Sequence, residues 1–416
     1  MEAHKIRNRT LFIGAVILTG AVAGAFVWAF FFVMNLGLNF LWKTVPESIG
    51  FAFFPLVACT LGGLIIGLYE KRFGPYPEEL NSVMKKVKEN GRYEYDSIGV
   101  SSVAALLPLL FGGSIGPEAG LTGAIAGLCT WVGDRMKRFG SDFKHLTQIG
   151  TSAALTAIFT APLLGFAAPL YGSLENNDND DEGFVIPKTS KIIIYFCAIA
   201  GALGAFMGLG ALFGTGGGLP HFSEITIGTT ELIWLIPIVL IGAIGGWLYH
   251  LFNRFSLGLS TILGKRPVIK AVIAGFVLAA CGMMLPFTMF SGESQTHTLS
   301  EIWLGIPAIV LLLTGFVKLF VTPFCINMGW RGGHFFPVIF AGISIGYGCA
   351  ALTGADPVFC MCASTAAICG GVMRQPLMAV LLLFLCFPVK GIVIMLIGAL
   401  IGSVIPLPKF LKEEAE

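Results

Sequence analysis

The hydrophobic residues of this chain form long runs, and the polar residues gather in short stretches between them. Residues 11–42 and 51–69 are each apolar over about the 20 residues that a helix needs to cross a bilayer. The same pattern predicts spans at 191–213, 232–252, 271–285, 302–322, 338–352 and 391–405, and shorter or split helices at 98–111, 149–158, 162–170 and 363–387. The sequence therefore predicts an all-α protein that crosses the membrane many times.

Composition and charge support this prediction and exclude other classes. Of the 416 residues, 55% are hydrophobic and only 12% are charged, whereas soluble domains carry about 25% charged residues. The net charge of +2 gives no reason to expect nucleic acid as a partner. Lysine and arginine gather at 1–10, 70–95 and 134–145, so we expect these stretches to be cytoplasmic. They also gather at 253–270, which we expect to be a further basic loop.

Metal, cofactor and enzyme chemistry have no counterpart in the sequence. The ten cysteines lie mostly in apolar segments, where thiols act as small hydrophobic groups. The six histidines are dispersed and show no ligand spacing such as His-Glu-x-x-His. The acidic loop at 175–188 lacks the final glutamate of a calcium loop, because position 189 is Thr189. We expect no cofactor, no metal and no enzymatic activity.

One interrupted stretch, residues 112–120, stands out within the apolar sequence. It reads Gly-Gly-Ser-Ile-Gly-Pro-Glu-Ala-Gly and is followed by small and aliphatic residues. Proline is favoured in a first helical turn, so this stretch predicts a helix that begins at or near Pro117, at membrane depth. The first N–H groups of such a helix have no acceptor within it and carry the positive end of its dipole. A dehydrated anion is the natural ligand for them.

Two further stretches repeat this pattern. Residues 331–337 read Arg-Gly-Gly-His-Phe-Phe-Pro and precede another helix of small apolar residues. A weaker version, Gly-Pro-Tyr-Pro-Glu-Glu, occupies residues 74–79. Several helices that begin at membrane depth predict an anion site formed by their converging N-terminal ends.

The two halves of the chain share one plan. The helix after Pro117 is followed 45 positions later by Pro162-Leu163, and the helix after Pro337 is followed 39 positions later by Pro376-Leu377. We therefore divide the chain into a terminal segment at 1–10, membrane halves at 11–213 and 214–408, and a tail at 409–416. Repeats of inverted orientation around a site at the membrane midplane are a common transporter solution.

The motifs together resemble those of the CLC chloride channels and chloride/proton exchangers, over nearly the whole chain. Residues 113–117 resemble the family's Gly-x-Glu-Gly-Pro, residues 332–337 its Gly-Gly-x-Phe-x-Pro, and residues 73–78 a degraded Gly-Ser-Gly-Ile-Pro-Glu. Within the family, Gly-Pro-Glu and Arg-Gly-Gly-x-x-Phe-Pro are most similar to a bacterial branch of ion-transport proteins. The resemblance implies an inverted repeat, a homodimer with one pathway per subunit, cytoplasmic termini and a bacterial inner membrane location.

The resemblance also implies which residues line the pathway. These are Gly74, Pro75, Tyr76, Gly113, Ser114, Ile115, Gly116, Gly333, His334, Phe335 and Phe336. Three departures from the family are informative. Ile115 replaces the gating glutamate, Gly74 replaces the serine that contacts the central anion, and Gly172 replaces the inner proton-transfer glutamate. The pathway tyrosine near the C-terminus is also missing. Without the gating glutamate and the inner proton-transfer glutamate, coupled proton exchange lacks its usual proton carriers.

Each remaining candidate residue has two interpretations. Glu118 lies three positions after Ile115, so we expect the two to share a helix face; it is either a relocated gate or an acid that complements the helix dipole. Arg331 is either a vestibule charge or a side chain that reaches the interface, and His334 is either a pH-sensitive group or a neutral hydrogen-bonding residue. Phe335 is either a constriction or a packing aromatic, and Tyr76 either replaces the lost serine hydroxyl or is an interfacial tyrosine. Arg374 either satisfies carbonyls at a helix end or faces a vestibule.

Three classes of function follow. The first is an uncoupled, channel-like pathway for small anions, with chloride as the expected substrate. The second is a proton-coupled exchanger that uses Glu118 together with Glu175 or His334. The third, a membrane enzyme or scaffold, has no supporting motif. Fluoride or bicarbonate remain alternative substrates, although the first motif differs from that of the family's fluoride specialists.

Overall fold

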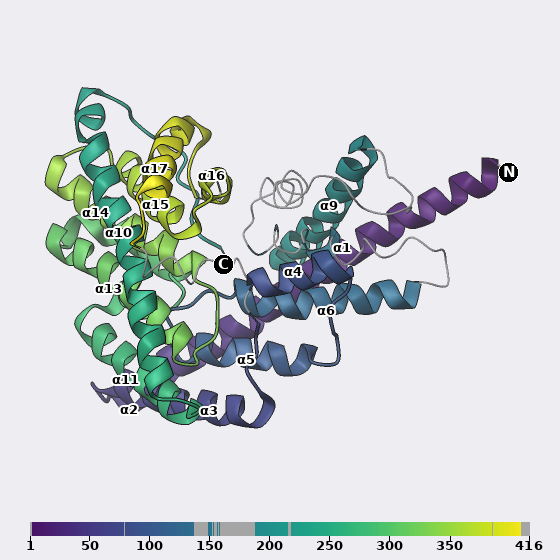
Figure 1. Cartoon of the computed structure of the whole chain (residues 1–416), viewed down its shortest axis with the longest axis horizontal. Helices are drawn as coiled ribbons and strands as arrows, with labels where there is room; N and C mark the ends of the chain where they lie inside the picture. Colours follow the sequence, from purple (N-terminus) through teal and green to yellow (C-terminus); the bar gives the residue numbers. More distant parts are fainter. Residues whose placement is uncertain are drawn as a thin grey trace. The chain divides into compact units, whose positions relative to one another are not determined.

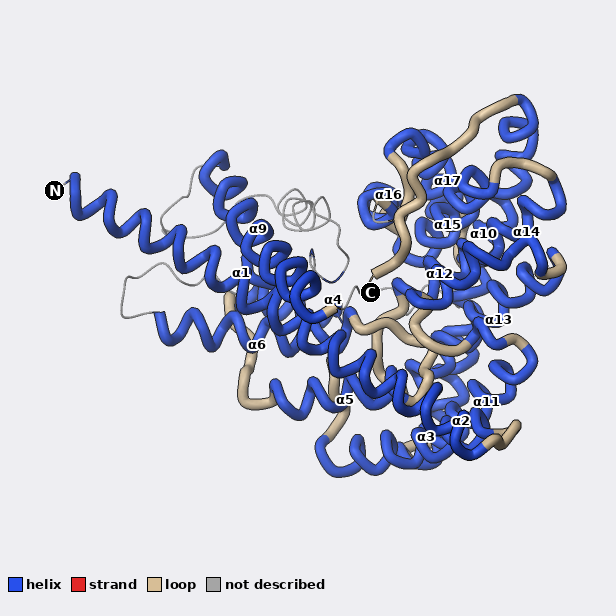
Figure 2. The backbone as a smooth tube through the Cα atoms, turned by 180° about the vertical axis from the view of Figure 1, so that it is seen from behind, coloured by secondary structure: helices blue, strands red, loops and turns tan. Residues whose placement is uncertain are grey.

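The computed structural model describes residues 2–78, 80–136, 188–214, 218–384 and 386–408, together with isolated positions between 149 and 158. In these ranges the regular elements are helices, and the only strand-like feature is one isolated bridge (Figure 2). Seven of the described helices are long and apolar enough to cross a membrane. The predicted all-α membrane architecture is therefore confirmed. The short helix after Pro162, Glu175 with the acidic loop, Gly172 and the tail at 409–416 lie outside the described residues.

The chain folds into two compact units that alternate along the sequence. The first comprises Met1–Asn35, Pro77–Val103 and Glu118–Gly217, and the second comprises Leu36–Tyr76, Ala104–Pro117 and Gly218–Glu416. The second unit contains the residues 74–76, 112–117 and 331–337 that the sequence singled out. The first unit contains Glu118.

In the first unit, α1 (Glu2–Asn39) packs against α9 (Lys188–Phe213) through small residues. A Cβ added to Gly20 or Gly24 would lie 2.1 Å from the carbonyl oxygen of Ala198 or Ala202, so the two backbones are in direct contact. Glycines one turn apart commonly allow this close approach between membrane helices. Helix α4 (Leu80–Asn90) completes the described core of this unit by packing on α6 (Glu118–Met136).

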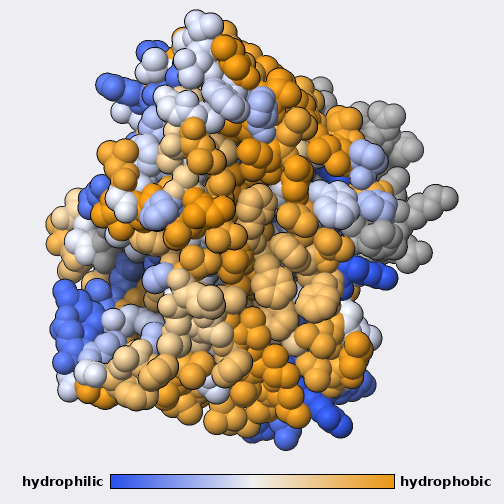
Figure 3. All heavy atoms as spheres, turned by 90° about the vertical axis from the view of Figure 1, so that its left-hand side faces the viewer, coloured by the Kyte–Doolittle hydropathy of each residue, from blue (hydrophilic) through white to orange (hydrophobic). Residues whose placement is uncertain are grey.

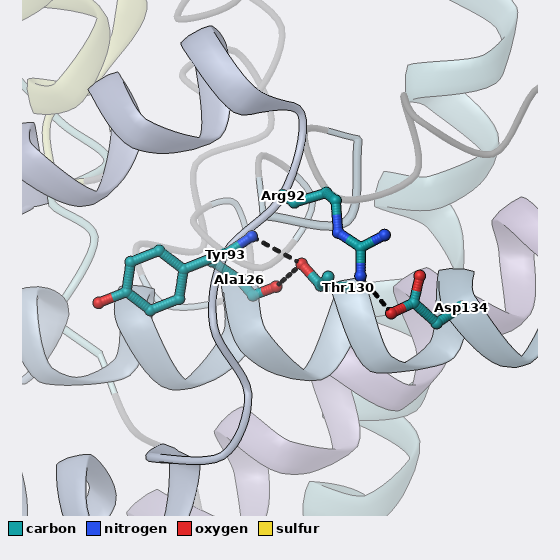
Figure 4. A network of polar contacts seen from close by, with 5 residues as sticks. All are labelled: Arg92, Tyr93, Ala126, Thr130 and Asp134. Atoms are coloured by element: carbon teal, nitrogen blue, oxygen red, sulfur yellow. Dashed lines mark hydrogen bonds and ion pairs between the residues drawn. The ribbon is translucent and has the colours of Figure 1, made fainter.

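A polar network fixes the segment after α4 to α6 (Figure 4). The amide of Tyr93 donates to the Thr130 hydroxyl at 3.0 Å, and that hydroxyl donates to the carbonyl of Ala126 at 2.8 Å. Arg92 forms an ion pair with Asp134 at the neighbouring turn. The predicted cytoplasmic basic stretch at 70–95 is therefore partly helical and is anchored at its end.

The second unit is built around α14 (Phe335–Thr353), which lies beside α13 (Ala308–Asn327) and α15 (Pro357–Met373) (Figure 1). Most of α14 is buried, and its glycines allow close packing: a Cβ on Gly342 or Gly346 would lie 2.5 Å from the backbone of α15. The surrounding elements are α10 (Thr229–Ile262), α16 (Pro376–Leu383), α17 (Ile392–Val404), and the pair α3 (Phe54–Phe73) and α11 (Pro267–Met284).

The outer surface of this unit is apolar. Large exposed hydrophobic side chains include Ile233 on α10, Phe276 on α11 and Ile309 on α13. Figure 3 shows a broad apolar face on the molecule, as expected for a surface that contacts lipid. The chain is a multi-pass integral membrane protein.

Two predicted boundaries are wrong. The basic stretch at 253–270 is not a single loop, because α10 continues to Ile262 and α11 begins at Pro267. Charged and polar residues near a helix end do not by themselves terminate it, and here the helix ends just before the left-handed Gly264. The span predicted at 302–322 begins at Ala308, after the short helices α12 (Glu293–Ile302) and η5 (Trp303–Gly305).

Candidate functional site

The two glycine motifs meet directly. Gly116 and Gly333 form an isolated antiparallel bridge in which each backbone N–H donates to the carbonyl of the other, at 2.7 and 2.8 Å. Gly116 lies two residues before α6, and Gly333 lies two residues before α14. The bridge therefore joins the segments that lead into the two interrupted helices, and it uses the amides of both glycines.

Packing around the bridge is reciprocal. Ile115 is fully buried and fills the space beside Gly332, where an added Cβ would lie 2.4 Å from the Ile115 Cδ1 atom. On the other motif, an added Cβ on Gly113 would lie 3.0 Å from the indole of Trp330. That indole is itself held in place, because its Nε1–H donates to the carbonyl of Ala271 at 2.8 Å. Gly332 thus leaves room for a large side chain of the first motif, and Gly113 leaves room for the residue that directly precedes the second motif.

Contacts with α13 and with the loop before α12 hold the first motif. The Ser114 and Thr322 hydroxyls lie 3.1 Å apart within hydrogen-bonding distance. At the start of the motif, the carbonyl of Gly112 accepts from the Phe290 amide at 2.8 Å. Gly112 has φ of +84°, which favours glycine at this turn. The Ser114 hydroxyl is therefore engaged with Thr322.

His334, in the middle of the second motif, is the N-cap of α14. Its ring lies 4.4 Å from the Phe335 ring and 6.0 Å from the ring of Tyr249, measured between centroids. Phe335 and Phe336 already belong to the helix, and Phe336 is fully buried. The helix thus begins three residues before the position predicted, Val338, with Pro337 inside its first turn, where proline is tolerated.

The amides next to the bridge differ from those within it. Among the described residues, no backbone carbonyl accepts a hydrogen bond from the amides of Ile115 and His334. Ile115 is fully buried, and His334 is partly exposed and adjoins the positive end of the α14 dipole. An unpaired N–H at such a position is a suitable donor for an anion.

The third motif is connected to the second through an ion pair. Arg331 lies 3.3 Å from Glu70, a residue in the last turn of α3, directly before Gly74. Gly74 has φ of +96° and ends α3, and its carbonyl accepts from the Tyr76 amide at 2.9 Å. The described contacts of Gly74, Pro75 and Tyr76 stay within their own segment. Arg331 is therefore paired with a carboxylate, and the connection to the bridge runs through Glu70.

Glu118 is the first residue of α6 and is fully buried. The prediction that Glu118 and Ile115 share a helix face is wrong, because the helix begins at Glu118 and Ile115 lies in the preceding segment. The bridge with Gly333 holds that segment in an extended form. Glu118 does lie in the first turn, where a carboxylate complements the dipole.

Two basic residues of the second unit, Arg374 and Lys318, lie outside the three motifs. Arg374 donates to the carbonyls of Ser403 and Ile405 at 2.6 and 2.7 Å, so the prediction that it satisfies carbonyls at a helix end is confirmed. Lys318 was not singled out in the sequence, although it lies in the middle of an apolar span. A lone lysine at that depth is itself a signal of function that a search for glycine motifs does not detect.

The fold and the paired helix starts define a polytopic membrane protein of the anion-transport class. The chain belongs to the CLC family: the profile of the family described as "Voltage gated chloride channel" matches residues 62–406. The resemblance found in the motifs is therefore confirmed. Members of this family are channels and transporters rather than enzymes.

Curated relatives and solved structures agree with this assignment. The chain is 26% identical over 364 residues to the "Putative ion-transport protein YfeO" of Salmonella newport, covering 82% of this chain and 81% of that protein. It is 23% identical to the "Chloride channel protein CLC-e" of Arabidopsis thaliana, covering 94% of this chain and 59% of that protein.

The solved structures show the fold. A slow cyanobacterial Cl⁻/H⁺ antiporter superposes with a TM-score of 0.72 at 18% identity, covering 94% of this chain and 93% of that one. A CLC-type fluoride/proton antiporter gives 0.70 at 19% identity, with 94% and 95% covered. The predicted fold class is therefore confirmed, and family membership supports transport of anions across a membrane.

Proposed function

We propose that this protein transports small inorganic anions, chloride above all, through a channel-like pathway that is not coupled to protons. The observation that best supports this proposal is the bridge between Gly116 and Gly333. Next to it lies Ile115, at the position of the family's gating glutamate. An isoleucine side chain can neither mimic an anion nor carry a proton. The anion then passes a site from which the usual competing carboxylate is missing.

The proposed donors are the backbone amides of Ile115 and His334. Gly116 and Gly333 fix the geometry of the two segments, because their own amides are used in the bridge. Gly113 leaves room for the indole of Trp330, and Ser114 anchors the first segment to α13. Backbone donors at a dehydrated position favour weakly hydrated anions such as chloride, bromide and nitrate.

The remaining pathway residues have supporting roles in this proposal. Phe335 and Phe336 line the start of α14 on its apolar side. Gly74, Pro75 and Tyr76 form the approach to the pathway from the end of α3. Arg331 contributes positive charge at that approach, reduced by its ion pair with Glu70.

Proton-coupled exchange through Glu118 is the second candidate. It is favoured by one observation, a fully buried carboxylate at the first position of α6. An ionised Glu118 would compete with anions for donors at the helix start, and a protonated one would not. Inner proton transfer would then require His334 or Glu175.

The substitution E118Q tests this candidate. If Glu118 gates, wild-type flux rises as the pH falls from 7.5 to 4.5, and E118Q removes that dependence while it keeps the side-chain size. Stopped-flow anion flux into vesicles, measured across this pH range, gives the profile. If the wild type and E118Q show the same pH profile, Glu118 does not gate, and its role is to complement the dipole of α6.

Simultaneous measurement of anion and proton movement in liposomes tests the main proposal. We expect a chloride gradient to discharge at a rate set by the membrane potential, with no accompanying uphill proton movement. Chloride, bromide and nitrate should permeate, and gluconate should not. Proton uptake driven by a chloride gradient would contradict the uncoupled pathway, and fluoride or bicarbonate selectivity would revise the substrate.

We also propose the organisation in the membrane. The two halves at 11–213 and 214–408 form the inverted repeat, with the segments 1–10 and 409–416 on the cytoplasmic side of a bacterial inner membrane. The positive residues of the stretches at 1–10 and 70–95 support this orientation. The active form is a homodimer with one pathway in each subunit.

A further inference from the structure

Two buried hydroxyl groups meet at the first glycine motif. Ser114 belongs to that motif and Thr322 to α13, and their hydroxyl oxygens lie 3.1 Å apart. Ser114 is 0% exposed and Thr322 is 1% exposed, so bulk water does not reach either group. A hydroxyl group that is buried without a hydrogen-bond partner is costly. Each of the two hydroxyl protons therefore needs an acceptor.

One of these two protons has no acceptor in the protein. A hydroxyl group has one proton to donate, so the pair has two, and the contact between the two oxygens uses one of them. Among the described residues, neither hydroxyl makes a second hydrogen bond. The remaining proton is thus buried without a protein acceptor, which indicates a ligand that accepts hydrogen bonds.

Other buried threonines indicate which proton remains. A threonine inside a helix commonly donates its hydroxyl proton to the carbonyl four residues earlier. Thr322 lies inside α13 but makes no such bond, because its hydroxyl is directed at Ser114. Its proton is therefore available for Ser114, and the proton of the Ser114 hydroxyl is left over. The buried threonines that follow the common pattern, with distances of 2.6–2.8 Å, are Thr19, Thr122, Thr130 and Thr296.

The remaining proton lies next to a proposed anion donor. Ser114 directly precedes Ile115, whose backbone amide donates to no backbone carbonyl among the described residues. The geometry of the chain keeps the hydroxyl of one residue within a few ångströms of the next amide. A water molecule at these two donors would bring two more protons that need acceptors, whereas an anion brings none. The pair of donors therefore suits an anion better than water.

We propose that Ser114 donates its hydroxyl proton to the transported anion, and that Thr322 is the positioning residue that orients this hydroxyl. The inference rests on the proposed function and adds a side-chain donor to it. Hydrogen bonds in a chain strengthen one another, so the Ser114 hydroxyl is a better donor while it accepts from Thr322. The pair supplies the hydroxyl donor that Gly74 cannot. A small anion such as chloride gains more from this donor than a large one such as iodide, because the attraction weakens with distance.

Five variants separate a donor from an anchor. S114A removes the proposed donor, and S114C keeps a side chain of similar size with only a weak donor. T322V removes the second hydroxyl and keeps the shape of the side chain, and T322S restores a hydroxyl. T19V is the matched control, because Thr19 is a fully buried threonine of the first unit whose hydroxyl bonds within α1 at 2.8 Å. Calorimetry on purified protein in detergent measures the binding of chloride and of iodide, and liposomes give the ratio of chloride to iodide flux.

We expect S114A to weaken chloride binding by about tenfold or more, which is the effect of losing one hydrogen bond to a charged group. Iodide binding should weaken by a smaller factor, so the preference for chloride over iodide falls in both measurements. T322V should change the preference in the same direction with a smaller loss of binding, because the Ser114 hydroxyl remains but is no longer oriented. T322S and T19V should behave as the wild type does. If S114A does not remain monodisperse, S114C decides the question, and its preference should shift as that of S114A does.

The outcomes separate the two proposals. If the wild type transports chloride and S114A keeps the wild-type affinity and preference, the role of Ser114 is overturned and anion transport stands. S114A and T322V break the same contact, so equal losses without a change of preference would show that the hydroxyl pair only anchors the motif, which also overturns the inference. If the wild type neither binds nor passes an anion, the proposed function itself fails.

Discussion

Replacing Ile115 with glutamate is expected to make anion flux steeply dependent on pH. At pH 7.5 the I115E variant should conduct at least about tenfold less than the wild type, because an ionised carboxylate at this fully buried position competes for the donors that hold the anion. Burial and low dielectric disfavour the charged form, so flux should recover as the pH falls and the carboxyl group is protonated. Chloride efflux from liposomes between pH 7.5 and 4.5 measures the profile.

The isosteric variant I115Q is the control for this experiment. It places a polar side chain of the same size at position 115 without a titratable group, so its flux should be nearly constant across the pH range. If I115E and I115Q show the same dependence of flux on pH, residue 115 does not lie at the anion pathway.

The substitution G332A is expected to cause the largest loss among single methyl additions near the bridge. The new Cβ would lie 2.4 Å from Cδ1, 2.8 Å from Cβ and 2.9 Å from Cγ1 of Ile115. A β-branched side chain has little freedom to move aside, and overpacking of a buried site costs about 1–3 kcal/mol. Because the adjoining Gly333 must keep its bridge with Gly116, we expect flux to fall by about tenfold or more. Flux in liposomes and thermal stability in detergent give the two readouts.

Two further variants test the cause of that loss. G258A adds the same methyl group to a glycine of α10 that has no neighbour within 4 Å, and it should leave flux unchanged. The double variant I115A/G332A removes the contacts with Cδ1 and Cγ1 of residue 115 and keeps the one with its Cβ, so its loss of stability should be smaller than the sum of the two single losses, with a coupling of about 0.5–3 kcal/mol. Strict additivity of I115A and G332A would show that the two residues do not share this contact.

The spans and the helix starts were predictable from the sequence, and the bridge was not. Long apolar runs and the prolines at 117 and 337 carry strong local information on where helices run and begin. Helix α6 begins at Glu118, one residue from the position expected. The reciprocal hydrogen bonds of Gly116 and Gly333 join residues more than 200 positions apart, and nothing in the local pattern of either motif specifies a partner.

The errors also have physical causes. The shared helix face of Ile115 and Glu118 was inferred from a spacing of three, which holds only inside a helix, and the bridge keeps Ile115 outside it. Hydropathy does not single out Lys318, because one lysine barely changes the mean value of a 20-residue span. The carbonyls that surround it come from the loop at 287–290, which is separate in sequence and contains no acidic residue.

The position of a bound anion can be observed directly. Crystals of the wild-type protein grown or soaked in bromide should show an anomalous peak within about 3.5 Å of the backbone nitrogens at Ile115 or His334, beside the bridge of Gly116 and Gly333. The peak should weaken in I115E crystals at neutral pH, where the carboxylate competes for the same donors. If bromide is found only elsewhere in the protein and these amides bind water or protein groups, the amides of Ile115 and His334 do not form the anion site.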